Sequence, residues 1–206
     1  CTYPILGCTD SNALNYDPTA TIDDGSCTNV ILGCTDPTAS NYDVTAVADD
    51  GSCIYVAGMV NLFFSEYAEG SSNNKYLEIY NPSVNNVDLS DYLVVGNYNG
   101  NPFNDTLSFP SGTIISAGGV YVIASSQADT VITSLADTLI ISAYNGGTSY
   151  VCVFNGDDVR ALVYVGATSS IIIDIVGLDD GIDPGSGWEV AGVSNGTKDH
   201  TLVRKC

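Results

Sequence analysis

The residues best suited to chemistry in this sequence are oxygen-bearing side chains that recur in two tandem stretches. Residues 7–27 and 33–53 agree at most aligned positions, and each carries an Asp, an Asn-Tyr-Asp triplet and an Asp-Asp pair. Such oxygens in short, glycine-containing turns suit Ca²⁺, which takes about six to eight oxygen ligands in flexible geometry. We therefore expect calcium binding by Asp10, Asn15, Asp17, Asp23 and Asp24, and by Asp36, Asn41, Asp43, Asp49 and Asp50.

The same residues also have a simpler use. Asp and Asn favour turns whether or not a metal is present, because their short side chains hydrogen-bond the nearby backbone. The EF-hand spacing is absent from the sequence. Solvated turn formers are therefore the alternative to calcium ligands, and magnesium, which demands stricter geometry, is the less suitable ion.

Four of the seven cysteines lie at equivalent positions in the two stretches. The positions shared by the two stretches provide almost no aliphatic core, so cross-links or bound cations must replace it. Cys8 with Cys27 and Cys34 with Cys53 would close equivalent loops, and we expect a disulfide within each stretch. Zinc is the competing explanation, but there is no C-x-x-C motif and the one histidine, His200, is remote in sequence. Disulfides indicate a secreted or cell-surface protein.

The other three cysteines are Cys1, Cys152 and Cys206, and an odd total leaves at least one sulfur unpaired or bonded outside the chain. Residues 1–8 mirror residues 27–34, which places Cys1 where a repeat would end. One explanation is a piece of a longer repeat-containing protein, or a free thiol. The other is a head-to-tail polymer joined through an end cysteine, because such non-closing contacts give filaments. Cys152 is expected to be either a buried free thiol or bonded to Cys206.

The chain is strongly acidic. Its 206 residues carry 24 acidic and five basic side chains, for a net charge of −19, and no basic residue precedes Lys75. Nucleic-acid binding is not expected, because phosphate contacts need Lys and Arg, and anionic membrane surfaces are disfavoured for the same reason. The sequence has no initiator Met, no signal peptide and no apolar run of transmembrane length, so we expect either a processed product whose export signal has been removed or an excised segment, without membrane insertion.

The two stretches resemble the GCTDxxAxNYxPxAxxDDGSC repeats of large secreted proteins from Bacteroidota. The two stretches are also similar to the calcium-binding thrombospondin type 3 repeats. The resemblance covers residues 7–53 and implies an extracellular setting and calcium binding, but no catalytic chemistry. The second stretch has Val44 where the first has Pro18, which leaves the expected ligands in place.

From about Val56 the sequence changes to short apolar runs separated by Gly, Asn, Ser and Pro. The runs are rich in β-branched and aromatic residues, and no amphipathic helix of three turns is evident. We divide the chain into residues 1–55, with little regular structure, and 56–206, an all-β domain expected to form a β-sandwich. The expected strands lie within 60–68, 75–81, 92–98, 106–110, 113–117, 120–125, 150–155, 161–165 and 171–178.

The second part resembles a lamin-tail-type domain, which implies an immunoglobulin-like sandwich. The resemblance is carried by FFSEYAEGSSNNKYLEIYNPS, VDLSDYLV, FPSGTIISAGGVYVIAS and NGDDVRALV, and by the tail GSGWEVAGVSNGTKDHTLVRK. In bacteria such domains accompany secreted nucleases, phosphatases and surface proteins, so the resemblance implies a binding or scaffolding role. It supplies no catalytic residues.

Two glycosylation patterns occur. Asn104 and Asn195 begin N-x-[ST] tripeptides. Thr106, Thr130 and Thr138 each lie between an Asp and an aliphatic residue, which resembles the O-glycosylation signal of Bacteroidota. The alternative is that all five are ordinary loop residues.

No constellation of nucleophile, base and metal is evident, so we expect no enzyme. The first functional hypothesis is an extracellular, calcium-stabilised subunit of a surface appendage, filament or adhesin, with the chain itself as partner. The second is an accessory module of a larger secreted protein or enzyme that binds a glycan or another ligand.

Overall fold

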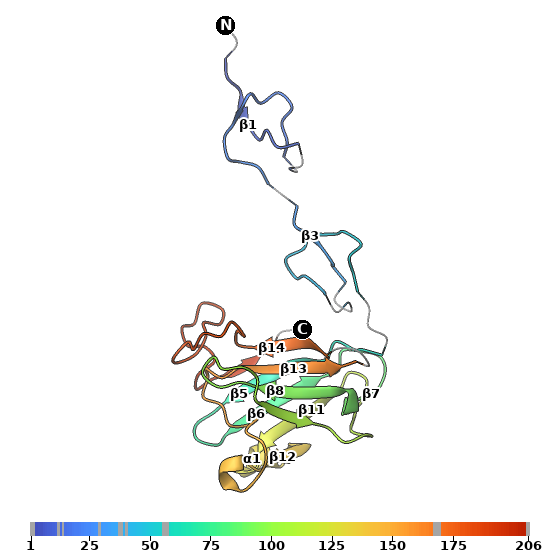
Figure 1. Ribbon diagram of the computed structural model, residues 1–206, viewed down its shortest axis with the longest axis vertical. Coiled ribbons are helices and arrows are strands. Elements are labelled where there is room, and N and C mark those ends of the chain that lie inside the picture. The colour runs from blue at the N-terminus through green and yellow to red at the C-terminus, as the bar shows by residue number, and fades with distance from the viewer. Residues whose placement is uncertain are drawn as a thin grey trace. The chain divides into compact units, whose positions relative to one another are not determined.

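A computed structural model describes residues 3–11, 13, 15–28, 30–36, 39, 41–54, 58–166 and 170–204. The chain divides into two compact units, Cys1–Ala57 and Gly58–Cys206, and each is described by itself (Figure 1). Cys1 and Cys206, whose partners the sequence leaves open, lie outside the described residues. No helix among the described residues is long and apolar enough to cross a membrane.

The N-terminal unit consists of two small segments, each closed by a disulfide. The pairs are Cys8–Cys27 and Cys34–Cys53, with a Cα–Cα distance of 4.8 Å in both. Each segment adds one short parallel pairing, which the sequence did not predict. The pairs are β1 (Leu6–Gly7) with β2 (Ile22–Asp23) and β3 (Leu32–Gly33) with β4 (Ala48–Asp49).

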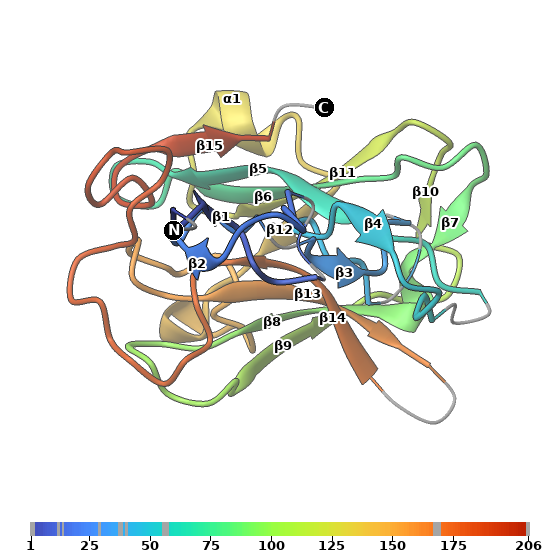
Figure 2. The same cartoon turned by 90° about the horizontal axis from the view of Figure 1, so that it is seen from above.

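The second unit is a β-sandwich of two sheets, seen as two layers in Figure 2. One sheet has the order β12-β11-β6-β5-β15, and the other has the order β14-β13-β8-β9. All pairings in these two sheets are antiparallel except β11 with β12. The first sheet contains β5 (Phe63–Glu69), β6 (Lys75–Tyr80), β11 (Val120–Ser125), β12 (Thr138–Ile140) and β15 (Thr201–Val203). The second contains β8 (Tyr92–Gly96), β9 (Asp105–Ser108), β13 (Arg160–Val165) and β14 (Ser170–Val176).

Short elements complete the sandwich. β7 (Val87–Asp88) and β10 (Ile114–Ile115) form a small antiparallel pair. The described helical turns are η1 (Leu89–Asp91), α1 (Thr130–Thr133) and η2 (Ala143–Asn145), and the longest has four residues. The fold is therefore mostly β, as the sequence predicted.

The core lies between the two sheets. Strand alternation turns Leu77 and Ile79 of β6 and Val94 of β8 inward, where they are fully buried. A second, smaller cluster forms around Val95, Ala161 and Val163, on the alternate positions of the strands of the four-stranded sheet. Both sets follow from the apolar runs that predicted the strands.

One predicted strand is wrong. Residues 150–155 form turns and irregular chain instead of a strand, although Val151, Cys152 and Phe154 are buried as a strand interior would be. Carbonyl groups of this segment accept hydrogen bonds from the Arg160 side chain. A side chain therefore occupies the place that a neighbouring strand would take.

Candidate functional sites in the acidic repeats and the sandwich

The aspartates of the repeats fold the backbone around them. Oδ1 of Asp17 accepts hydrogen bonds from the Thr19 N–H at 2.8 Å and the Thr19 hydroxyl at 2.7 Å. Oδ1 of Asp23 accepts a hydrogen bond from Gly25 N–H at 2.9 Å, and Oδ1 of Asp24 accepts one from Ser26 N–H at 3.0 Å. The same set recurs with Asp43, Asp49 and Asp50 in the second repeat.

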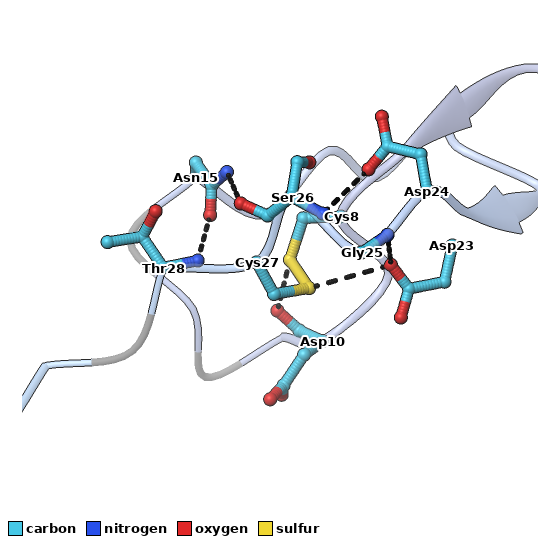
Figure 3. Close-up of a disulfide and its surroundings, with 9 residues drawn as sticks. All are labelled: Cys8, Asp10, Asn15, Asp23, Asp24, Gly25, Ser26, Cys27 and Thr28. Atoms are coloured by element: carbon cyan, nitrogen blue, oxygen red, sulfur yellow. Dashed lines mark hydrogen bonds between the residues drawn. A yellow bond between two sulfur atoms is a disulfide. The ribbon is translucent and has the colours of Figure 1, made fainter.

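Asn15 ties together two parts of its repeat that are distant in sequence (Figure 3). Its amide NH₂ donates to the Ser26 carbonyl at 2.7 Å, and its oxygen accepts from the Thr28 N–H at 2.7 Å. Asn41 makes the equivalent pair of bonds in the second repeat. An asparagine predicted as a metal ligand therefore also serves as a cross-link beside the disulfide.

The described residues hold no group of three or more His, Cys, Asp or Glu side chains arranged to bind a metal ion. Figure 3 shows Asp10, Asp23 and Asp24 spread around the Cys8–Cys27 disulfide instead of converging. The Asp10 carbonyl accepts a hydrogen bond from Ala13 N–H at 3.1 Å, and Asp36 does the same in the second repeat. The oxygens predicted as ligands are thus present and of the right chemistry, but the structure holds them apart.

The turn hydrogen bonds stabilise the ionised aspartates. Bonding by Thr19, first through its hydroxyl and then through its N–H, lowers the pKa of Asp17. Ser26 lowers the pKa of Asp24 in the same way, and Asp43 and Asp50 repeat the pattern in the second repeat. These carboxylates stay charged to low pH, so the repeats keep their negative charge.

The sandwich encloses a cation. The Arg160 side chain is 0% exposed, and its guanidinium carbon lies 5.0 Å and 5.1 Å from the ring centroids of Tyr98 and Phe154. Burying a charge is costly unless its hydrogen bonds are satisfied. The acceptors are the carbonyl oxygens of Val151 (2.9 Å), Asn97 (3.1 Å), Val159 (2.7 Å), Tyr150 (3.4 Å) and Val153 (3.0 Å).

Two titratable groups lie near this cation. Cys152 is a buried free thiol, and burial raises its pKa to about 12, so it remains neutral. Burial also raises the pKa of Asp158 to about 6, while the neighbouring Arg160 charge acts to lower it. Asp158 accepts from Asn99 N–H at 3.3 Å. The Asn155 side-chain nitrogen is oriented toward Asp157 and Asp158, and it donates to the Asp158 carboxylate at 2.9 Å.

An apolar groove of ≈ 530 Å³ opens between β5, β14, β15 and the loop that follows β14. Volumes of this size are typical of sites that bind small molecules or side chains. Trp188 stands over Gly177, where φ is +96° and a Cβ would come within 2.8 Å of the indole, so glycine is required there. The walls include Phe64, Tyr67, Val176, Trp188, Leu202 and Val203.

The Tyr67 side chain lines the groove. Its buried hydroxyl, which is under the influence of the charges of Arg160 and Glu69, has no hydrogen-bond partner among the described residues. Arg204 lies at the rim and pairs with Asp174 of β14 at 2.8 Å. The other oxygen of Asp174 accepts from Phe64 N–H at 2.7 Å, so one carboxylate joins the two sheets beside the groove.

The glycosylation candidates differ in access. Asn104, Thr106, Thr130 and Asn195 are exposed. Thr138 is half-buried, and its hydroxyl lies 2.5 Å from that of Tyr121. Thr197, the third residue of the Asn195 tripeptide, is buried and donates to the Gly156 carbonyl at 2.6 Å.

The two-sheet fold and the appended disulfide segments define a β-sandwich protein with a cross-linked N-terminal extension. Residues 56–177, more than half of the chain, match the Lamin Tail Domain family, and the chain belongs to this family. No curated protein matches the chain. The repeats and the tail that carries Trp188 and β15 lie outside the matched residues.

Sequence reasoning missed the groove and the enclosed arginine. The groove joins strands that are far apart in sequence, so no local pattern reveals it. The sole tryptophan, set in the glycine-rich run GSGWEV, was the available signal. For Arg160, the signal was a basic residue at the start of the apolar run RALVYV in a chain with only five basic residues.

Proposed function

We propose that the chain is a non-enzymatic extracellular structural protein, a subunit of a surface appendage, filament or adhesin that associates with copies of itself. The observation that carries this proposal is the duplication of the N-terminal unit. Both repeats have the same disulfide, the same aspartate turns and the same asparagine cross-link. A unit repeated in this way suits a spacer, because it is held together by cross-links and local hydrogen bonds and needs no large core.

Calcium is the ion we propose for the repeats, as thrombospondin type 3-like units of the kind found in secreted Bacteroidota proteins. Residues 1–53 carry eight aspartates and no basic residue, so their carboxylates repel one another. The donors are all hard oxygens, which fit Ca²⁺. Calcium bound there would draw together carboxylates that the structure holds apart, and its affinity would be modest.

Electron microscopy of the non-reduced protein, with calcium and then with chelator, tests the proposal. We expect filaments or ordered assemblies in calcium, and we expect chelation to loosen residues 1–53 to limited proteolysis while the disulfides stay closed. The double substitution Asp23→Asn with Asp24→Asn should reproduce the loosening in the first repeat only. Dispersed particles in both conditions would contradict self-assembly, and unchanged protease resistance in chelator would contradict a structural ion.

The second candidate function is a ligand- or glycan-binding accessory module of a larger secreted protein. It is supported by the apolar groove with Trp188 at its wall. Saturable binding of a soluble glycan by a protein that stays monomeric in calcium would favour this module over the structural subunit.

A further inference from the structure

We propose that the loop at residues 155–158 of the sandwich binds a hard divalent cation, Ca²⁺ or Mg²⁺. Its protein ligands would be the carboxylates of Asp157 and Asp158 and the amide oxygen of Asn155. The site belongs to the second compact unit and is separate from the calcium proposed for the repeats. It would stabilise the sandwich itself, whatever the chain assembles with.

Two buried carboxylates at this loop need a counter-ion. Four acidic side chains are buried in the described part of the sandwich. Glu69 forms an ion pair with Lys75 at 3.1 Å, and Asp105 accepts hydrogen bonds from three neighbouring groups. Asp157 and Asp158 are 7% and 4% exposed, and neither forms an ion pair within the described chain. Buried charges are normally paired or bound to a metal, so these two carboxylates are the ones that a cation would complete.

The basic groups nearby balance these charges only in part. Arg160 directs its donors to five carbonyl oxygens, so its charge acts on Asp158 without a direct ion pair. Burial raises the pKa of Asp157, the charge of Asp183 raises it further, and the exposed Lys198 lowers it from beyond ion-pair distance. The potential at the loop is therefore negative, which favours a divalent cation over a monovalent one.

Asn155 brings a third polar side chain to both carboxylates. Its nitrogen faces Asp157 and Asp158 and lies 2.9 Å from an oxygen of Asp158. The two ends of an amide are nearly equal in size, and the terminal torsion of asparagine is roughly two-fold. A half-turn therefore puts the amide oxygen where the nitrogen lies. Oxygens about 3 Å apart are spaced as neighbouring ligands of one ion whose metal–oxygen distances are about 2.0–2.6 Å.

A buried hydroxyl beside the loop points to a ligand independently of the acids. Tyr67 is 2% exposed, and its hydroxyl has no hydrogen-bond partner among the described residues. Its ring stacks on Phe154, the residue before the loop, with the ring centroids 4.6 Å apart. Burial raises the pKa of the hydroxyl, and the charges that act on it include Arg160, Asp158 and Asp157. A hard cation with three protein ligands keeps several waters, and one of them would supply the partner that a buried hydroxyl requires.

The loop is open to solvent at one point and held on both sides. Asn155 is exposed, so an ion can enter past its side chain. The Asn99 N–H donates to Asp158 at 3.3 Å, and the Gly156 carbonyl accepts from the Thr197 hydroxyl at 2.6 Å. Only the amide has to turn when the ion binds, and a site fixed in this way loses little conformational entropy on binding. Because only two of the three ligands are carboxylates, the site agrees with the finding that no group of three acidic, His or Cys side chains is placed for a metal among the described residues.

Thermal melts of the full chain at neutral pH test the site. Trp188 is the only tryptophan and lies in the second unit, so its emission follows unfolding of the sandwich and not of the repeats. The melts are made in chelator, in Ca²⁺, in Mg²⁺ and in NaCl of matched ionic strength. We expect at least one divalent ion to raise the melting temperature by about 4 °C over NaCl, the gain for an ion at about ten times its Kd. The ion with the larger rise is the one the site prefers. No rise over NaCl with either ion would mean that only screening of the −19 net charge occurs, and would overturn the site.

Matched variants locate the ion. Asp157→Asn with Asp158→Asn should abolish the rise, because both carboxylate ligands are lost. Asp137→Asn, at an exposed aspartate of the sandwich, should keep it, and so should Asp23→Asn with Asp24→Asn in the first repeat. A rise that survives the loss of Asp157 and Asp158 would overturn the site. A rise lost in the repeat variant would assign the ion to the repeats instead, with the same consequence.

Asn155→Asp distinguishes a metal ligand from a structural hydrogen-bond donor. In chelator the third carboxylate should lower the melting temperature, because three like charges then meet. With the preferred ion the rise should be about twice that of the wild type, since more ligand charge strengthens binding of a hard cation. If Asn155 serves only to donate to the two acids, the variant should lose stability equally in both conditions, and that result would overturn the site. The calcium of the repeats, which limited proteolysis measures, would still stand.

Discussion

At the scale of single residues, Arg160 shows how one buried charge can hold residues 150–153, which pair with no strand among the described residues. Its planar guanidinium donates to five carbonyl oxygens between two aromatic rings. The carbonyls of Tyr150, Val151 and Val153 accept from Arg160 in a segment that pairs with no strand of the described chain. The cation therefore supplies donors to the backbone carbonyls of Val151 and Val153. The Tyr150 carbonyl accepts in addition from the Tyr98 hydroxyl.

Replacing this arginine by lysine should be severe despite the retained charge. A lysine has three donors on one nitrogen and cannot reach carbonyls arranged around a fork. We expect Arg160→Lys to lower the free energy of unfolding by about 3 kcal/mol or more, because a buried charge and several carbonyls lose partners. Urea denaturation measures this. Arg204→Lys is the matched control, with an expected loss of about 1 kcal/mol or less, since this exposed side chain makes one ion pair with Asp174. Equal losses in the two variants would contradict the role assigned to Arg160.

At the scale of elements, the sequence predicted most of the sandwich because most of its strands have a recognisable pattern of apolar residues within a few positions. β6 alternates between buried and half-buried positions, and β11 and β13 are mostly apolar runs that include valine and tyrosine. The segment 150–155 has the same composition, and what distinguishes it is an arginine from the following strand. The parallel pairing of β12 with β11 also depends on how the chain returns after α1, which no local periodicity encodes.

The repeats could be predicted as cross-linked units for a different reason. Two near-identical copies show which positions are shared, so the pairs Cys8–Cys27 and Cys34–Cys53 followed from the alignment of one copy on the other. The use of Asn15 could not be derived in this way. An amide in a turn-rich segment looks the same whether it binds an ion, bridges two backbone groups or does both, and only the fold shows that it bridges Ser26 and Thr28.

The link between the two sheets beside the groove gives a prediction about β14. Asp174 accepts from Phe64 N–H and pairs with Arg204, and Phe64 lies where the β5–β6 register shifts. We expect Asp174→Ala to lower the free energy of unfolding by about 2 kcal/mol, because the Phe64 N–H loses its acceptor. Arg204→Met removes the ion pair and the contact of the guanidinium with the Phe63 ring, at 5.0 Å, but keeps the acceptor of Phe64 N–H, and it should cost less than about 1 kcal/mol. Thermal denaturation ranks the two variants, and faster hydrogen exchange at Phe64 in Asp174→Ala alone would identify the bond responsible. A larger loss in Arg204→Met would mean that the ion pair, and not the backbone contact, holds this edge.

At the scale of the whole molecule, we expect the stability of the two units to change with pH in different ranges. The turn hydrogen bonds lower the pKa values of Asp17, Asp24, Asp43 and Asp50. A lowered folded pKa adds stability that is present above the unfolded value, about 4, and is lost as pH falls below it. The repeats should therefore be indifferent to acid until about pH 4.

The sandwich should become more stable on mild acidification, because burial raises the pKa of Asp158 to about 6. For an acid with a raised folded pKa, the folded state binds the proton more tightly. Stability is then greatest below the unfolded value, about 4, and falls as pH rises through about 6. Between pH 7 and pH 5 the free energy of unfolding should rise by about 1 kcal/mol, or about 3 °C in the melting temperature.

Asp158→Asn, which is neutral at every pH, should abolish most of this rise in stability. Asp137→Asn should keep it, because Asp137 is an exposed aspartate that accepts from Val122 N–H. A rise that survives Asp158→Asn would assign the effect to relief of the −19 net charge. Because the repeats are unaffected in this window, any loss of self-association at pH 5 would arise at the contacts between copies and not from unfolding of either unit.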